Sequence, residues 1–333
     1  MKMTKPRTFA VSYFLGRAFF LGFGFSLLFK LLDKDAWIAS FLGIFLGCGI
    51  LWLFERLKEK HPLSNAFQKF IFFIFNFFVF NQILFIFETF CSSFYLIKST
   101  SIYILAPLFF IILRITKNGF QTISRVSDVL FPIEIALLFV VSLGLLRNIN
   151  LEYFKPIMDT KPSTLFQGAI YFACYSTAPY FLLWNEKTEK NILKPYLVSA
   201  LSIFSAALFI TAVLGPNLAQ IYRYPEYMTL KKLKLFNFIE KVENIVSIAW
   251  LFDLFITLSV SGNNIKQMLP KKYRTYTFSV VLIILFGVSL YGGTHYQGEL
   301  WIYTYLPILL GGFMLLLIFV SFFSRKKEPT KLS

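Results

Sequence analysis

The feature that most constrains this chain is a series of apolar runs, each about 20 residues long, separated by short polar segments. Folded as a helix at 1.5 Å per residue, such a run crosses the roughly 30 Å hydrocarbon core of a bilayer. The composition agrees with this interpretation, because 57% of the residues are apolar and only 15% are charged, against about a quarter charged in soluble domains. These features exclude a soluble enzyme, a disordered chain and a disulfide scaffold. They predict an all-α polytopic membrane protein without a soluble domain.

The apolar runs predict ten transmembrane helices in a single transmembrane domain spanning residues 1–333. The helices cover approximately residues 9–31, 36–57, 66–97, 101–116, 128–146, 164–184, 192–215, 236–262, 276–292 and 299–323. The connecting segments are too short to hold a nucleotide-binding domain, and none contains a Gly-rich phosphate loop. Transport driven by ATP hydrolysis in this chain is therefore excluded.

The basic residues orient these helices. Of the 33 Lys and Arg residues, 22 fall on the side that holds both ends of the chain and 10 on the other, with Lys241 unassigned. Because cytoplasmic loops are enriched in Lys and Arg, this bias predicts that both termini are cytoplasmic, as an even number of spans requires. Membrane topology thus accounts for the net charge of +16, and no nucleic-acid partner is predicted.

Two of the expected helices contain residues that interrupt helical geometry. Helix 1 carries Gly-Phe-Gly-Phe-Ser at 22–26, and helix 6 carries Ala-Cys-Tyr-Ser-Thr-Ala-Pro at 173–179. Unwound backbone in mid-membrane can bind a zwitterion or an ion, although such glycines also serve as packing surfaces and prolines as simple kinks. The two segments fall in the first helix of each half. The sequence therefore predicts a LeuT-like 5+5 arrangement, with inverted repeats at about 9–146 and 164–323 and with helices 1 and 6 broken.

Four ionisable residues lie deep in the apolar runs: Arg17, Glu88, Glu134 and Asp253. Charged groups in a membrane are costly and are functional candidates by default. One hypothesis is that Glu88, Glu134 or Asp253 carries a proton during transport. The alternative is that Arg17 pairs with a carboxylate and only holds helices together.

A third hypothesis concerns the hydroxyl groups of helix 8. The side chains of Thr257, Ser259 and Ser261 are candidate ligands for a sodium ion together with helix 1 carbonyls, although such hydroxyls often only link helices.

Other chemistry is not indicated. The three cysteines, Cys48, Cys91 and Cys174, lie inside apolar runs, and His61 and His295 flank different helices. This spacing suits neither a metal site nor a nucleophile and base in reach of each other. We expect no metal, no cofactor and no enzymatic activity.

Several segments resemble a known family, the endospore germination permeases. They are Ile-Ser-Arg-Val-Ser-Asp-Val-Leu-Phe-Pro at 123–132, Lys-Asp-Ala-Trp-Ile at 34–38, Arg-Tyr-Pro at 223–225 and Phe-Ile-Glu-Lys-Val-Glu at 238–243. Gly22-Phe23-Gly24 and Glu88 also fall where that family has Gly-x-Gly and Glu. The likeness covers nearly the whole chain in order. This family is the B subunit of nutrient germinant receptors, within the amino acid–polyamine–organocation transporter superfamily.

The resemblance implies a small-nutrient site between helices 1, 3, 6 and 8. It also implies association with A and C receptor subunits in the spore inner membrane. The residues expected to bind substrate are Gly22, Phe23, Gly24, Phe25, Ser26, Glu88, Tyr175, Ser176, Thr177 and Thr257.

Three functions remain open from the sequence. The first is a spore germination receptor subunit that binds, and in one version transports, an amino acid or similar nutrient and contributes to triggering germination. The second is a stand-alone amino-acid permease in a bacterial cytoplasmic membrane, with proton coupling as one variant. The third is a structural or lipid-handling membrane protein.

Overall fold

The computed structural model describes residues 8–60, 63, 66–97, 99–186, 191–233, 242–295 and 299–322, and within them the chain is helical without strands. The α-helices are α1 (Phe9–Arg17), α2 (Phe25–Leu32), α3 (Ala36–Lys60), α4 (Ala66–Phe94), α5 (Ser101–Asn118), α6 (Phe120–Leu145), α7 (Pro162–Thr177), α8 (Leu193–Phe209), α9 (Pro216–Ile221), α10 (Pro225–Leu230), α11 (Val242–Met268), α12 (Arg274–His295) and α13 (Glu299–Phe322).

The outer surface of this bundle is apolar. Large side chains such as Phe45, Phe110, Phe139 and Leu315 are each more than 60% exposed. Among the described residues, eight helical stretches are long and apolar enough to cross a membrane. Hydrocarbon is the solvent that suits such a surface. The chain is therefore an integral membrane protein.

The eight stretches do not correspond one to one with the ten expected helices. One stretch, Phe9–Glu59, is 51 residues long and covers the first two expected spans. The sixth expected span, 164–184, is divided between α7 and a 3-10 helical segment, Ala178–Asn185, and has no counterpart among the eight. Ten spans remain a prediction.

Two helices extend furthest beyond their expected bounds. α6 begins directly after Gly119, eight residues earlier than expected, and α11 continues to Met268. Both extensions are polar, so hydropathy did not include them. The α11 extension is fixed by hydrogen bonds, since the Asn264 side chain donates to the Asn76 amide and to the Leu182 carbonyl at 2.9 and 2.7 Å. The expected start of this helix, at 236, lies outside the described residues.

The backbone between α1 and α2 leaves helical geometry. Leu21 has φ −62° and ψ 113°, Gly22 has φ 71° and ψ −21°, and a π-helical turn covers Phe20–Gly24. Positive φ favours glycine, because a Cβ atom at that conformation is strained. A Cβ at Gly22 would also collide with the ring of Tyr224. The sequence of this turn therefore suits its conformation.

The helix that contains α7 changes type near its middle. After Thr177 the α-helix gives way to the 3-10 segment Ala178–Asn185, with Pro179 in its first turn. Proline has no N–H to donate to the preceding turn, which explains why the α-helical ladder stops there.

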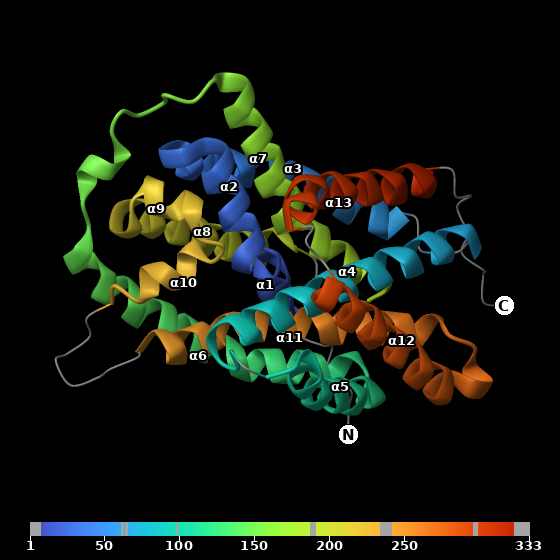
Figure 1. Cartoon of the computed structure of the whole chain (residues 1–333). Helices are drawn as coiled ribbons and strands as arrows, with labels where there is room; N and C mark the ends of the chain where they lie inside the picture. The colour runs from blue at the N-terminus through green and yellow to red at the C-terminus, as the bar shows by residue number, and fades with distance from the viewer. Residues whose placement is uncertain are drawn as a thin grey trace.

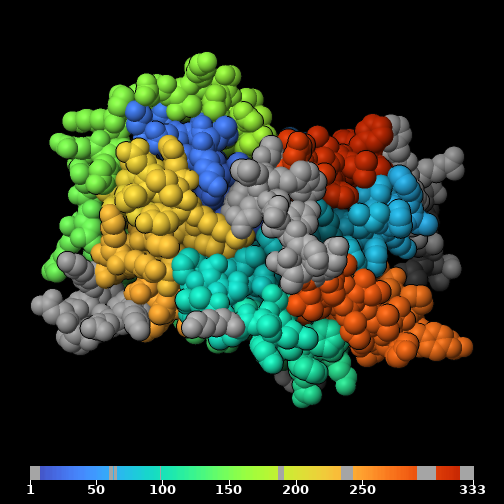
Figure 2. Space-filling view, in the orientation of Figure 1, coloured from blue at the N-terminus to red at the C-terminus, as the bar shows by residue number. Residues whose placement is uncertain are grey.

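α1 lies in the middle of the bundle and packs against α6, α7, α8 and α11 (Figure 1). In Figure 2, α2 and α7–α10 gather on one side of the molecule, and α4, α12 and α13 on the other. Every residue of α1 from Ala10 to Arg17 is buried. A polar group on α1 therefore needs partners from the surrounding helices.

Candidate functional site

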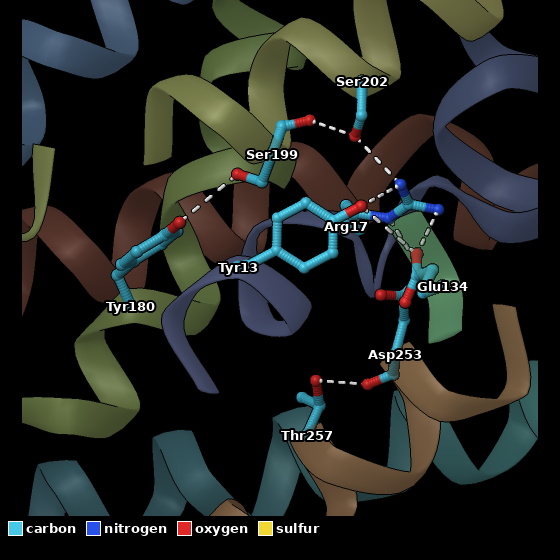
Figure 3. Close-up of polar contacts among 8 residues, drawn as sticks. All are labelled: Tyr13, Arg17, Glu134, Tyr180, Ser199, Ser202, Asp253 and Thr257. Carbon is cyan, nitrogen blue, oxygen red and sulfur yellow. Dashed lines mark hydrogen bonds and ion pairs between the residues drawn. The ribbon is translucent and has the colours of Figure 1, made fainter. Parts of the chain in front are cut away.

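A buried ion-pair cluster, the Arg17 cluster, joins α1 to α6 and α11. The Arg17 guanidinium contacts Glu134 Oε1 at 2.8 Å through Nη2 and Asp253 Oδ2 at 3.1 Å through Nε. Its Nη1 donates to the Tyr13 hydroxyl at 2.7 Å and to Ser202 Oγ at 2.9 Å (Figure 3). Only 6% of Arg17 is exposed. Arg17 therefore forms ion pairs with two carboxylates and hydrogen bonds with two hydroxyls at the same time.

The cluster continues through hydroxyl groups towards the 3-10 segment after α7. The Ser202 hydroxyl donates to the Ser199 carbonyl at 2.7 Å, and Ser199 Oγ lies 3.3 Å from the Tyr180 hydroxyl (Figure 3). Both Ser199 and Tyr180 are fully buried. The chain of polar contacts therefore links α1 to the segment that carries Pro179.

The Arg17 cluster has an excess of negative charge. It holds one guanidinium and two carboxylates, Glu134 and Asp253. One oxygen of each carboxylate, Glu134 Oε2 and Asp253 Oδ1, is buried without a hydrogen-bond partner among the described residues. Buried polar atoms are normally satisfied, so this pattern favours binding of a cation, a proton or water beside the cluster.

A third buried carboxylate occupies the backbone turn between α1 and α2. The Gly22 N–H donates to Glu226 Oε1 at 2.7 Å, and Glu226 itself is 3% exposed. Its second oxygen, Oε2, is buried without a partner in the described part of the chain. Glu226 lies in α10, between the spans Leu193–Leu214 and Glu243–Met268. Burial raises the pKa of this carboxyl to about 8.

This pKa gives a testable pH dependence. We expect the folded protein to lose stability as the pH rises from about 5 to above 8. Unfolded Glu titrates near 4.3, so the folded state binds the Glu226 proton more tightly across this window. The slope approaches about 1.4 kcal/mol per pH unit. Charged groups that share its surroundings are Arg17 and Asp253 across the cavity and Arg223 beside it in the chain.

The measurement is the midpoint of thermal unfolding at pH 5.5, 7.0 and 8.5, compared between the wild type and Glu226→Gln. The amide keeps an acceptor for the Gly22 N–H but does not titrate. The exposed Glu152→Gln serves as a control. An equal loss of stability with pH in Glu226→Gln would assign the slope to other groups.

A cavity of about 300 Å³ connects Glu226 to the Arg17 cluster. Its polar lining includes Arg17, Ser202, Glu226 and Asp253, and most of its wall is apolar. The complete lining is Arg17, Phe20, Leu21, Phe25, Ile135, Leu138, Phe139, Val141, Ser142, Leu145, Ser202, Ile203, Ser205, Ala206, Phe209, Ile210, Glu226, Thr229, Leu230, Val246, Trp250 and Asp253. A cavity of this size with a few convergent polar groups is typical of small-ligand sites.

Some of the residues expected from the sequence lie at this cavity. Phe25 and Asp253 line it, and Glu134 holds Arg17 from α6. Gly22 is adjacent, through its bond to Glu226.

The other expected substrate residues of the first turn lie elsewhere. The ring of Phe23 stacks on Phe85 with centroids 6.1 Å apart. A Cβ at Gly24 would contact the ring of Phe20, and Ser26 is fully buried. None of these three residues lines the cavity.

The expected residues of helices 3 and 6 also lie apart from the cavity. Glu88 accepts a hydrogen bond from Ser101 Oγ at 2.6 Å. Tyr175 packs against Phe20, Ser176 Oγ lies 3.3 Å from the Tyr196 hydroxyl, and Thr177 Oγ1 donates to the Ala173 carbonyl at 2.7 Å. Glu88 is therefore not part of the Arg17 cluster.

The hydroxyls of α11 are directed mainly to backbone carbonyls. Thr257 donates to Asp253 O at 2.8 Å, and Ser261 donates to Asn76 O at 2.7 Å. Ser259 Oγ is buried without a partner in the region described. Within that region no group of three His, Cys, Asp or Glu side chains could hold a metal ion.

Sequence reasoning missed three important lining residues, Ser202, Glu226 and Trp250. Glu226 follows Pro225 in the first turn of a short helix. Acidic residues are common in the first turn of helices, so this position gives no sign of a distant contact. Ser202 and Trp250 sit in apolar helices, where they resemble ordinary helix contacts. The one signal in the sequence that could have identified this segment is a carboxylate next to a proline, located between two spans.

The fold and the cavity together define a class of protein: a helical membrane protein with a ligand-sized, mostly apolar cavity that holds a few charged groups beside an interrupted central helix. Comparison with known families is more specific. The profile of the family described as "Spore germination protein", a spore permease family, matches residues 8–296. The chain belongs to this family, which confirms the resemblance seen in its sequence.

Two curated relatives agree with this assignment. The chain is 21% identical over 248 residues to the putative spore germination protein YfkT of Bacillus subtilis (strain 168), a match that covers 68% of each chain. It is 24% identical over 250 residues to spore germination protein XB of Bacillus anthracis, covering 71% of this chain and 70% of the relative.

Proposed function

We propose that this chain is a permease-like subunit of a spore germination receptor, which binds an amino acid or similar small nutrient in the cavity and contributes to triggering germination. Membership of the spore germination protein family supports the biological setting. The observation that carries the binding role is the cavity itself, which joins a non-helical backbone turn to a buried cluster of charges. Packing alone does not require either feature.

The proposed architecture is the LeuT-like one, with ten spans, inverted repeats at about 9–146 and 164–323 and both termini in the cytoplasm. The non-helical turn at Leu21 and Gly22 and the change of helix type at Ala178 support it, since they fall in the first helix of each half. Such turns leave backbone groups available for ligands. In this proposal the chain lies in the spore inner membrane with A and C receptor subunits.

The second candidate is a stand-alone amino-acid permease, with proton coupling as one variant. The Arg17 cluster favours it, because buried carboxylates with unsatisfied oxygens are suitable proton carriers. Glu134 and Asp253 are the candidates at the cavity, while Glu88 lies apart from it.

The first experiment measures binding. The purified chain in lipid nanodiscs is titrated calorimetrically with the common amino acids, short alkylamines, simple sugars and nucleosides. We expect at least one to bind with a 1:1 stoichiometry, and Ala206→Trp to abolish that binding, because Ala206 lines the cavity and an indole there would occupy space that the ligand needs. Binding unchanged by Ala206→Trp would place the nutrient elsewhere, and no binding by any compound would contradict the proposed role.

Flux then separates the two candidates. Uptake of the bound nutrient into proteoliposomes that contain only this chain would favour the permease, and dependence on an imposed pH gradient would favour proton coupling. Binding without flux, together with co-purification of A and C subunits from spore membranes, would favour the receptor subunit.

A further inference from the structure

We propose that the cavity selects a small apolar primary amine, bound as its ammonium ion, over ligands that carry a carboxylate. This inference rests on the proposed function, because it names the chemical class of the nutrient for the same cavity. Three features of the cavity support it.

The first feature is that the protein itself supplies the carboxylate at the backbone turn. A free N–H at an interrupted helix is a natural partner for the carboxylate of an amino acid. Here the Gly22 N–H already donates to Glu226 Oε1 at 2.7 Å. A ligand carboxylate would have to displace Glu226 or lie beside it, where, once Glu226 is ionised above its pKa of about 8, the like charges repel strongly at short range.

The second feature is the arrangement of charge. Arg17, the cation that lines the cavity, already contacts Glu134, Asp253, Tyr13 and Ser202. It is therefore committed to groups of the protein rather than to an incoming anion.

The carboxylates, by contrast, retain free acceptor capacity. Glu226 Oε2 and Asp253 Oδ1 are buried without partners in the described part of the chain, and both residues line the cavity at 3% exposure. An ammonium group offers three donors. With Glu226 ionised, Arg17 counted against Glu134, Asp253 and Glu226 leaves two negative charges, and the ammonium would neutralise one of them.

The third feature is the apolar wall. Phe20, Leu21, Phe25, Ile203 and Trp250 surround the polar groups. The aromatic ring of Trp250 suits a cation as well as an alkyl chain. The rim reaches Phe139, which is 64% exposed on α6. A compact alkyl body attached to an ammonium matches this division between charge and apolar surface.

Three compounds with the same isobutyl body test the inference by calorimetry in nanodiscs at pH 9, above the Glu226 pKa of about 8 and below the pKa of about 10.4 of an alkylamine, so that both partners are charged. They are 3-methylbutylamine, which has only the amine, leucine, which has both groups, and 4-methylpentanoate, which has only the carboxylate. We expect the amine to bind at least about tenfold more tightly than leucine and the acid not to bind, since one close like-charge contact easily outweighs a factor of ten. Ala206→Trp should abolish amine binding.

Variants of Glu226 separate its two proposed roles, which are to accept the Gly22 N–H and to attract the ammonium by its charge. Glu226→Gln keeps an acceptor for the Gly22 N–H but removes the charge, so we expect about a tenfold loss of amine affinity. Glu226→Ala frees the N–H and should raise leucine affinity by about tenfold. The exposed Glu152→Gln should change neither affinity.

Each outcome decides between the inference and the function on which it rests. Leucine binding as tightly as the amine, and lost in Ala206→Trp, would overturn the amine preference and leave nutrient binding intact. Amine binding that persists in Ala206→Trp would overturn the inference, because the amine would lie outside the cavity. If none of the three compounds binds, the inference fails, and the wider nutrient panel decides separately whether the proposed function also fails.

Discussion

Replacement of Arg17 by methionine is expected to lower the free energy of unfolding by about 3–5 kcal/mol, the usual cost of removing one partner from a buried ion pair. The reason is that Glu134 and Asp253 would then lie in the bundle with no cation beside them. Methionine retains most of the volume of the arginine stem, so the loss comes from charge rather than from a cavity. The measurement is the thermal unfolding midpoint of the purified protein in nanodiscs, together with its yield.

A triple variant keeps this prediction testable if Arg17→Met fails to accumulate. Combining Arg17→Met with Glu134→Gln and Asp253→Asn removes all three charges, and we expect it to recover most of the lost stability. A buried ion pair contributes little net stability over a neutral replacement, whereas a buried lone charge costs a great deal. A triple variant no more stable than Arg17→Met would show that Arg17 acts through packing.

A surface pair provides the control. Lys34 contacts Asp159 at 3.0 Å, and the Asp159 side chain is 63% exposed. Because exposed ion pairs contribute about 0–1 kcal/mol, Lys34→Met should change stability by no more than that. Arg17→Lys should fall between the wild type and Arg17→Met, since an ammonium cannot reproduce the fork of contacts that the guanidinium makes.

The Arg17 cluster illustrates what sequence reasoning can and cannot reach. Arg17 stands alone among apolar residues, so a buried partner was predictable from the cost of an unpaired charge in hydrocarbon. Which of the three deep carboxylates would pair with it was not. The answer depends on how α6 and α11 rotate about α1, and Glu88, equally deep in its apolar run, faces Ser101 instead.

The membrane-spanning helices were easier to predict from the sequence, because the length and hydropathy of each segment can be read without knowing its neighbours. A run such as 66–94 is apolar over most of its 29 residues, and its length and hydropathy together indicate a spanning helix. Helix ends were less predictable where they are polar. α6 begins at Phe120, because its first turns bury Phe120 and Ile123 against the bundle. α11 continues through Asn263 and Asn264, because hydrogen bonds rather than hydropathy hold this turn.

The contact between Gly22 and Glu226 was beyond the reach of the sequence. Gly22 could be identified as a position where another group approaches the backbone closely, since a glycine in an apolar helix often has that role. The approaching group is 204 residues away, in a short helix between spans. No periodicity or spacing links the two segments, and only the packed structure joins them.

Gly22→Ala is expected to lower the free energy of unfolding by about 2–6 kcal/mol. Two costs combine: an L-residue at φ 71° is strained by about 1–3 kcal/mol, and the added methyl group collides with the Tyr224 ring at a further cost of about 1–3 kcal/mol. The same substitution should weaken ligand binding, because any shift of this turn displaces Leu21, which lines the cavity. Thermal unfolding and the nanodisc titrations measure the two effects.

Two further variants separate strain from collision. Gly49 lies within α3, and no atom lies within 4 Å of the position that a Cβ would take there, so Gly49→Ala should stabilise the helix by up to about 1 kcal/mol. In a Tyr224→Ala background the collision is absent, and Gly22→Ala should then cost only the backbone strain. A double-mutant cycle gives the difference as a coupling of about 1–3 kcal/mol. If Gly22→Ala is as well tolerated as Gly49→Ala, the turn at Gly22 does not need glycine. The ligand chemistry inferred for the adjacent cavity would then lose its support, because it depends on the geometry of this turn.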